Sequence, residues 1–212
     1  ILMFDKSPWV DWRRDVIVYR EENSEANFYN EVLGLEYDEG VVPVTEADIR
    51  ACCTGGKMVE PEDYVWTGHT MYGGLDYGPV NSSKSNTLFA AMQVRGGSDP
   101  IIHVVYIKKY VGADAAYAYI HDDVPRLMNK LNIKIVGADF GLGEAPTAEI
   151  RRRTSFNKVI SYQHVPTQKE KMQYNHKLPA YTLNRTAIMT DFFTMIKKKK
   201  VVFPRWEDFE PY

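Results

Sequence analysis

The chain has 212 residues and a mass of 24.4 kDa; 44% of its residues are hydrophobic, 25% are charged, and its formal net charge at pH 7 is −2. This composition is that of an ordinary globular chain and excludes a disordered one, and no apolar run approaches the roughly 20 residues that a membrane-spanning helix needs. The two cysteines, Cys52 and Cys53, are adjacent, which disfavours a bridge between them and predicts a reducing compartment. The opening segment is charged too early for a secretory signal, and a start at Ile1 predicts a piece of a longer protein.

The first part of the chain predicts a short helical extension. Residues 24–34 and 45–55 each begin with a hydroxyl-bearing capping residue and end at a glycine, which is the pattern of two short helices. The character of the sequence changes near residue 65, where strand patterns begin. We therefore expect an extension over residues 1–64 and a separate domain over residues 65–212.

Strand and helix patterns alternate within the expected domain. Clusters of glycine, serine, asparagine and proline separate three strand-like segments, at residues 72–78, 86–96 and 101–111. The segments that follow are a helix at 114–132, a strand at 133–141, a helix at 145–155, a strand at 157–165 and a helix at 182–200. Pro125 either kinks the first of these helices or opens a second one.

This order of elements predicts an α/β fold of the ribonuclease H-like class. Three hairpin-linked strands followed by helix–strand alternation give a mixed five-stranded sheet with helices on both faces, because the later crossovers force parallel pairing. The first and fourth strands then lie side by side, about 4.8 Å apart, with their carboxyl ends opening onto one crevice. Asp76 lies late in the first strand and Asp139 late in the fourth, and each is followed after one aromatic residue by a glycine. The two carboxylates are therefore expected to converge.

Two converging carboxylates predict a site for divalent cations. Held close together in a cleft of low dielectric constant, they repel each other, which raises one pKa unless a cation neutralises them. Their oxygens suit a hard cation such as Mg²⁺ or Mn²⁺, and a pair of such ions can activate water for phosphodiester hydrolysis. Aspartates after strands are also common as helix caps or turn formers, and this alternative stays open for either residue taken alone.

Four segments of the chain resemble the nuclease half of phage terminase large subunits, the motors that package viral DNA. They are GGLDYGPV, IVGADFGLG, FYNEVLGLEYDEGVVPVT and NRTAIMTDFFTMIKKKKVVFPRWEDF. The resemblance implies that Asp76 and Asp139 are the first two metal-binding acids of an endonuclease that cleaves concatemeric double-stranded viral DNA with Mg²⁺ or Mn²⁺, as two ions. It also implies that residues 1 to about 60 connect to an ATPase domain, and we expect no ATP hydrolysis from this chain because it has no G-x-x-x-x-G-K-[ST] loop.

The same resemblance implies partners and a location. The partners are double-stranded DNA, the portal protein, the small terminase subunit and the ATPase domain, with no membrane, and the location is the host cytoplasm at the procapsid portal. Such nucleases carry a third acid on a C-terminal helix, and this sequence reaches Tyr212 before any such motif, so we expect that helix to be missing. Asp191 and Asp208 are the nearest substitutes, but the patterns place Asp191 on the polar face of a helix and Asp208 in a surface segment, and neither is assigned to the site.

Two basic runs are candidate contacts for DNA phosphates. The residues in question are Arg151, Arg152, Lys197 and Lys198. A solvated helix end explains the lysines equally well, because cations favour the C-terminus of a helix. Of the histidines, His164 and His176 either face the cleft or lie in loops.

Two other functions fit parts of the sequence. One is a catalytically silent docking module for the portal or capsid, because the third metal ligand is missing. The other is a fragment of an actin-like or sugar-kinase ATPase, in which LDYGPVNSSKSNT would form a phosphate-binding hairpin. That architecture needs two such domains, whereas only one fits in this sequence.

Overall fold

The structure is a computed structural model that describes six stretches of the chain. They are residues 11–22, 44–79, 86–141, 143–154, 158–165 and 168–209. The chain divides into two compact units, residues 1–45 and 46–212. The helix that the sequence predicts over residues 24–34 lies outside the described residues.

The first unit contains a short helical segment that the sequence patterns did not indicate. Trp12–Val18 form a π-helical stretch, η2, which continues into α1, Tyr19–Glu22. The Asp11 side chain caps its start, because one carboxylate oxygen accepts hydrogen bonds from the backbone N–H of Arg13 at 3.0 Å and of Arg14 at 3.1 Å. This cap satisfies two N–H groups that have no partner within the first turn.

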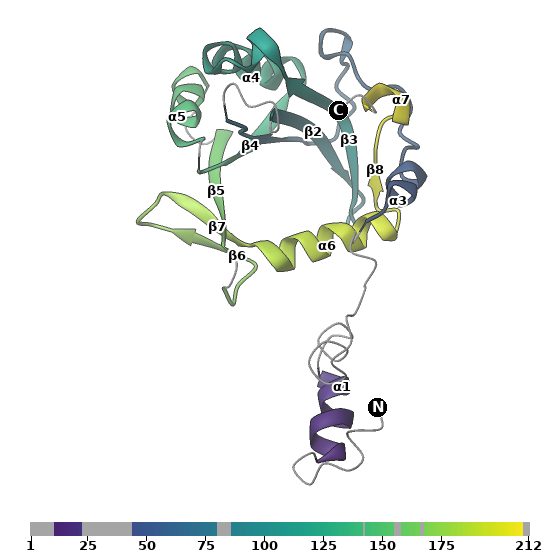
Figure 1. Ribbon diagram of the computed structural model, residues 1–212. Helices are drawn as coiled ribbons and strands as arrows, with labels where there is room; N and C mark the ends of the chain where they lie inside the picture. The colour runs from purple at the N-terminus through teal and green to yellow at the C-terminus, as the bar shows by residue number, and fades with distance from the viewer. Residues whose placement is uncertain are drawn as a thin grey trace. The chain divides into compact units, whose positions relative to one another are not determined.

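The second unit is built on one sheet of eight strands in the order β6-β7-β5-β4-β1-β2-β3-β8 (Figure 1). The strands are β1 Met71–Asp76, β2 Thr87–Arg95, β3 Ile101–Tyr110, β4 Ile133–Asp139, β5 Val159–Val165, β6 Met172–Asn175, β7 Ala180–Asn184 and β8 Val201–Val202. β1 pairs antiparallel with β2 and β2 with β3, whereas β1 with β4 and β4 with β5 are parallel. This central order is the ribonuclease H-like arrangement that the sequence predicts.

The predicted number of five strands was too low, because three short strands extend the two edges. β6 and β7 form a hairpin beside β5, and β8 pairs with β3 through two residues. β7 was missed because residues 182–184 form the last part of this strand, whereas the predicted helix began at residue 182. Strands of two to five residues are too short to show an alternating apolar pattern.

Helices lie on both faces of the sheet, as predicted. The second unit contains α3 Glu46–Ala51, η4 Pro61–Asp63, η5 Gly112–Ala115, α4 Tyr117–Lys130, α5 Glu144–Arg153, α6 Arg185–Lys197 and α7 Trp206–Phe209. Figure 1 shows α4 and α5 over one face and α6 across the other. α4 continues through Pro125, so the proline does not open a second helix. None of the described helices is long and apolar enough to cross a membrane.

The hydrophobic core lies between the sheet and the α4–α5 side. α4 contributes Ile120, Val124 and Leu127, which are fully buried at helical spacing, and β1 contributes Leu75. Burying each of these side chains contributes about 1.5–3 kcal/mol. Because successive side chains of a strand point to opposite faces, burial of Leu75 directs the next residue, Asp76, to the face away from this core.

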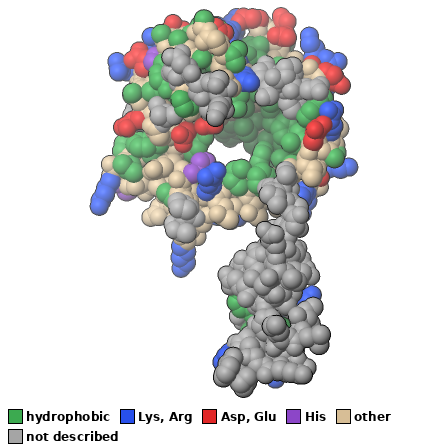
Figure 2. Space-filling view, viewed as in Figure 1, with side chains coloured by type: hydrophobic (Ala, Val, Ile, Leu, Met, Phe, Trp, Pro, Cys, Tyr) green, Lys and Arg blue, Asp and Glu red, His purple; other side chains and the backbone are tan. Residues whose placement is uncertain are grey.

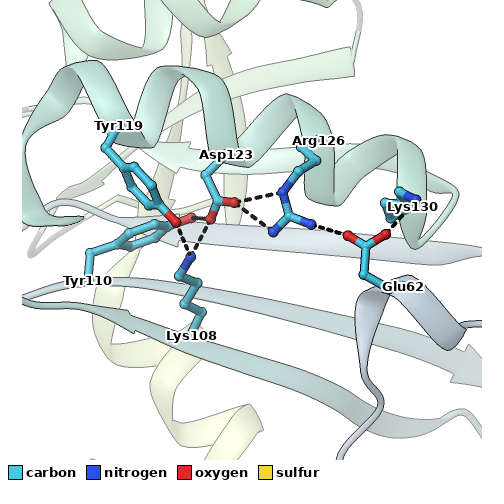
Figure 3. Close-up of polar contacts among 7 residues, drawn as sticks. All are labelled: Glu62, Lys108, Tyr110, Tyr119, Asp123, Arg126 and Lys130. Atoms are coloured by element: carbon cyan, nitrogen blue, oxygen red, sulfur yellow. Dashed lines mark hydrogen bonds and ion pairs between the residues drawn. The ribbon is translucent and has the colours of Figure 1, made fainter.

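An ion network centred on the buried Asp123 joins the sheet to α4 (Figure 3). The Asp123 carboxylate on α4 accepts hydrogen bonds from Lys108 Nζ at 2.6 Å and from the Tyr110 hydroxyl at 3.0 Å, both on β3. Arg126 donates to the same carboxylate at 2.7 Å and to Glu62 at 2.5 Å, and thereby ties η4 to the helix. Burial alone would raise the pKa of Asp123, but the hydrogen bonds from its cationic neighbours outweigh burial and hold this pKa below its usual value.

The second face of the sheet is only partly covered. Figure 2 shows a hollow lined by apolar side chains between the sheet and α6. Leu88, which is in register with Asp76, keeps 39% of its surface exposed, and Val94 on the same strand keeps 41%. Asp76 therefore lies on an accessible face.

Candidate active site

The strand register brings the two predicted acids together. Leu75 of β1 pairs with Ala138 of β4, so the next residue of each strand, Asp76 and Asp139, ends its strand at the same level and on the same face. Gly78 follows β1 at a point where a Cβ atom would come within 2.6 Å of the Asn86 backbone. A side chain at this position would therefore displace the chain that leaves Asp76.

The negative charge of Asp139 acts on Asp76. The pKa of Asp76 is raised, first by partial loss of hydration and then by the negative charge of Asp139, while His164 acts in the opposite direction. Asp76 still reaches solvent at the end of its strand. A partly dehydrated carboxylate beside a second carboxylate is more stable with a bound cation than as an anion without one.

Two residues that sequence reasoning did not assign to the site also belong to it. Tyr162 on β5 is in register with Asp139, and burial together with the charges of Asp76 and Asp139 raises the pKa of Tyr162 to about 12. The His164 ring lies edge-on to Tyr162, with 5.4 Å between ring centroids. Of the two histidines left open above, His164 therefore lies at the carboxylate pair.

The donor set suits a hard divalent cation but is small. Two carboxylates are the ligands that Mg²⁺ uses when it keeps several waters or substrate phosphate oxygens. Across the described stretches of the chain, no group of three His, Cys, Asp or Glu residues could hold a metal ion. Asp191 pairs with Lys171 at 2.6 Å. Asp208 accepts hydrogen bonds from the Met58 N–H and from Arg205, so both acids are engaged with other partners.

The four predicted phosphate contacts have different surroundings. Arg151 donates hydrogen bonds to the Val159 carbonyl at 2.9 Å and to the Ser161 hydroxyl at 2.7 Å, so part of its guanidinium holds β5. Arg152 keeps 75% of its side chain exposed and pairs with Glu149. Lys197 and Lys198, at the end of α6, are both exposed. A role of these four residues in DNA binding stays a prediction.

Comparison with known proteins shows the fold. No family model matches the chain, and no curated protein matches it. The structure is similar to that of the HK97 bacteriophage large terminase, with a TM-score of 0.50 and 10% identity over 98% of this chain and 47% of that chain. The structure is also similar to that of the large terminase nuclease from thermophilic phage G20c, with a TM-score of 0.45 and 13% identity over 74% of this chain and 75% of that chain. A third similar structure is the human cytomegalovirus terminase nuclease domain, Mn soaked and inhibitor bound, with a TM-score of 0.44 and 11% identity over 77% of this chain and 75% of that chain.

The chain therefore has the ribonuclease H-like fold, and it shares this fold with the HK97 large terminase. An identity of 10% to the HK97 large terminase shows a common fold and no more than that. The function of the site depends on its own residues and not on the fold that carries them.

Proposed function

We infer that this chain is a metal-dependent endonuclease that cleaves double-stranded viral DNA during genome packaging. The observation that carries this inference is the placement of Asp76 and Asp139 side by side at the ends of parallel strands, with their charges coupled. Metal ligands need to converge from elements that are rigid, and here both come from the centre of the sheet. The terminase likeness adds the packaging context, with DNA, the portal protein, the small terminase subunit and an ATPase domain as partners at the procapsid portal.

Asp76 and Asp139 would hold Mg²⁺ or Mn²⁺, and the bound cations would supply a water-derived nucleophile at neutral pH and charge stabilisation on the phosphate. The chain's own part is to fix the two carboxylates and to keep their face of the sheet open to a phosphodiester. Tyr162 keeps its proton at neutral pH, because its pKa is about 12, so its hydroxyl can donate a hydrogen bond beside the pair.

The test is nicking of supercoiled plasmid by the purified chain in Mn²⁺. Asp76→Asn and Asp139→Asn should each lower the nicking rate by more than about 100-fold. Residues that only support a metal ligand typically cost about 10–100-fold when they are replaced. Asp191→Asn is the matched control, because its carboxylate is exposed and pairs with Lys171, and it should cleave at the wild-type rate. Undiminished nicking by folded Asp76→Asn would exclude the assignment.

One observation favours a second function, a catalytically silent docking module for the portal or capsid. The described residues supply two carboxylates at the site and no third metal ligand. A folded wild-type chain that binds purified portal protein but leaves plasmid intact in Mn²⁺ would support this function. Cleavage that depends on Asp76 would exclude it.

A further inference from the structure

A small cavity lies at the side of β5 that faces away from β4. β7 pairs with β5 only from Tyr162 onward, so no described strand covers the main chain of residues 159–161 on this side. A cavity of about 180 Å³ occupies the uncovered stretch, between α5 and the β6–β7 hairpin. We call it the edge pocket; its lining includes Arg151, Ile160, Ser161, Tyr174, Pro179 and Tyr181.

The edge pocket combines aromatic faces with fixed polar groups. The rings of Tyr174 and Tyr181 are 5.1 Å apart between centroids at an interplanar angle of 66°, and Tyr174 keeps 42% of its surface exposed. Arg151 is held in place by its bonds to Val159 and Ser161. Tyrosine and arginine planes bind flat π-systems by stacking, while a guanidinium and a hydroxyl recognise polar ring edges.

The size and the charge of the region select the ligand. The volume is below the about 300–1,000 Å³ of pockets for drug-sized ligands, so one small planar group fits better than an extended molecule. Between residues 168 and 185 there is one acid, Glu170, against four cations, Lys169, Lys171, Lys177 and Arg185. A planar heterocycle attached to a polyanion matches both features, and a nucleobase of a DNA strand is such a group.

The edge pocket also lies near the carboxylate pair. Tyr162 is in register with Asp139 on one side and with Tyr181 on the other. Neighbouring strands are about 4.8 Å apart, so two strand spacings separate the acid of β4 from the tyrosine of β7. A strand whose phosphate lies at Asp139 can therefore place one of its bases at Tyr181.

We propose that the edge pocket binds an unpaired nucleobase of the DNA strand that is cut. The base stacks on one ring of the Tyr174–Tyr181 pair and meets the inclined second ring at its edge, beside the Arg151 guanidinium. This proposal rests on the proposed nuclease function and narrows its substrate. A base that remains in the duplex stack cannot enter a side pocket, so the enzyme favours DNA that is frayed, nicked or locally melted next to the cut.

The experiment is fluorescence anisotropy of the full chain in EDTA with two labelled probes of equal length, oligothymidine and an abasic oligonucleotide. Wild type should bind oligothymidine more tightly, because stacking needs bases. Tyr174→Ala combined with Tyr181→Ala should weaken oligothymidine binding by about tenfold or more and leave abasic binding unchanged. The matched control is Trp66→Ala, since Trp66 is 63% exposed and lines a different cavity with Ile133, at the start of β4; it should have no effect.

Phenylalanine at both tyrosine positions keeps the rings and should restore oligothymidine binding, which separates stacking from a folding defect. Equal wild-type affinity for the two probes, or unchanged oligothymidine binding by the double alanine variant, would overturn the proposal. Because binding is measured without metal, its failure is distinct from failure of the nuclease assignment, which rests on Asp76→Asn cleavage. Base-dependent binding that wild type shows and the double alanine variant loses, together with persistent cleavage by Asp76→Asn, would retain the edge pocket and remove the proposed catalytic site.

Discussion

Replacement of Asp123 by asparagine tests how the sheet is held to α4. The Asp123 side chain is 3% exposed and receives hydrogen bonds from Lys108, Tyr110 and Arg126. The neutral amide would leave Lys108, whose side chain is 17% exposed, without its counter-ion. Removing one partner of a buried pair costs about 3–5 kcal/mol, a large fraction of the about 5–15 kcal/mol by which a domain is stable.

This loss corresponds to a fall in Tm of about 6–20 °C, at about 2–4 °C for each kcal/mol in a chain of this length. Asp122→Asn is the control, because this neighbouring carboxylate is 73% exposed and pairs with Arg153 on the surface, and it should change stability by about 1 kcal/mol or less. The assay is thermal and urea unfolding followed by circular dichroism. A Tm for Asp123→Asn that matches that of Asp122→Asn would refute the reasoning.

The same variant should show a defined pH dependence. Because the pKa of Asp123 is lower in the folded chain than in the unfolded one, its ionised form stabilises the fold above the unfolded pKa of about 3.9. This stabilisation is lost as the pH falls from that value through the folded pKa. The stability difference between wild type and Asp123→Asn should therefore be constant near neutral pH and shrink below about pH 4. A difference that grows on acidification would contradict this sign.

Two further predictions concern the candidate site. Asp76→Asn should raise the Tm of the metal-free chain in EDTA at pH 7. Since the pKa of Asp76 is raised in the fold, its charge destabilises the fold above pH about 4, and the gain should vanish below that pH. An unchanged or lower Tm in EDTA would contradict the unfavourable coupling with Asp139. Gly143→Ala should cost about 1–3 kcal/mol in urea unfolding, because the added Cβ would overlap the Tyr77 ring and the Asp139 carbonyl, whereas Gly97→Ala, with no atom within 4 Å of the new Cβ, should not. Equal stability of the two glycine variants would show that the loop yields freely.

The sequence was sufficient to place the two acids, for identifiable physical reasons. β1 and β4 are six- and seven-residue strands that the sequence patterns placed to within two residues at each end. The order of hairpins and crossovers leaves few ways to assemble them. Asp76 and Asp139 each end such a strand, so the parallel pairing of β1 with β4 brings both acids to the same end of the sheet.

The surroundings of the two acids could not be predicted in the same way. Tyr162 and His164 lie at the pair because of the exact pairing of β5 with β4, and nothing in the residues of β5 specifies this register. Arg151 and Arg152 are equivalent in sequence, yet Arg151 bonds to β5 while Arg152 is 75% exposed. Contacts of this kind depend on tertiary packing, which overrides local pattern.

The edge strands were missed for a different reason. β6, β7 and β8 depend on pairing with strands that are already in place, and a strand of two to five residues has little propensity of its own. The hairpin of β6 and β7 is also what closes one side of the edge pocket. A pocket that depends on the pairing of such short edge strands leaves no short motif in the sequence.

The most direct measurement of the central claim is anomalous diffraction from crystals of this chain soaked in Mn²⁺. The account predicts an anomalous peak bonded to carboxylate oxygens of both Asp76 and Asp139, and no such peak in Asp76→Asn crystals soaked in the same way. A wild-type crystal in which Mn²⁺ binds elsewhere, or in which the two side chains diverge and bind no ion, would contradict it.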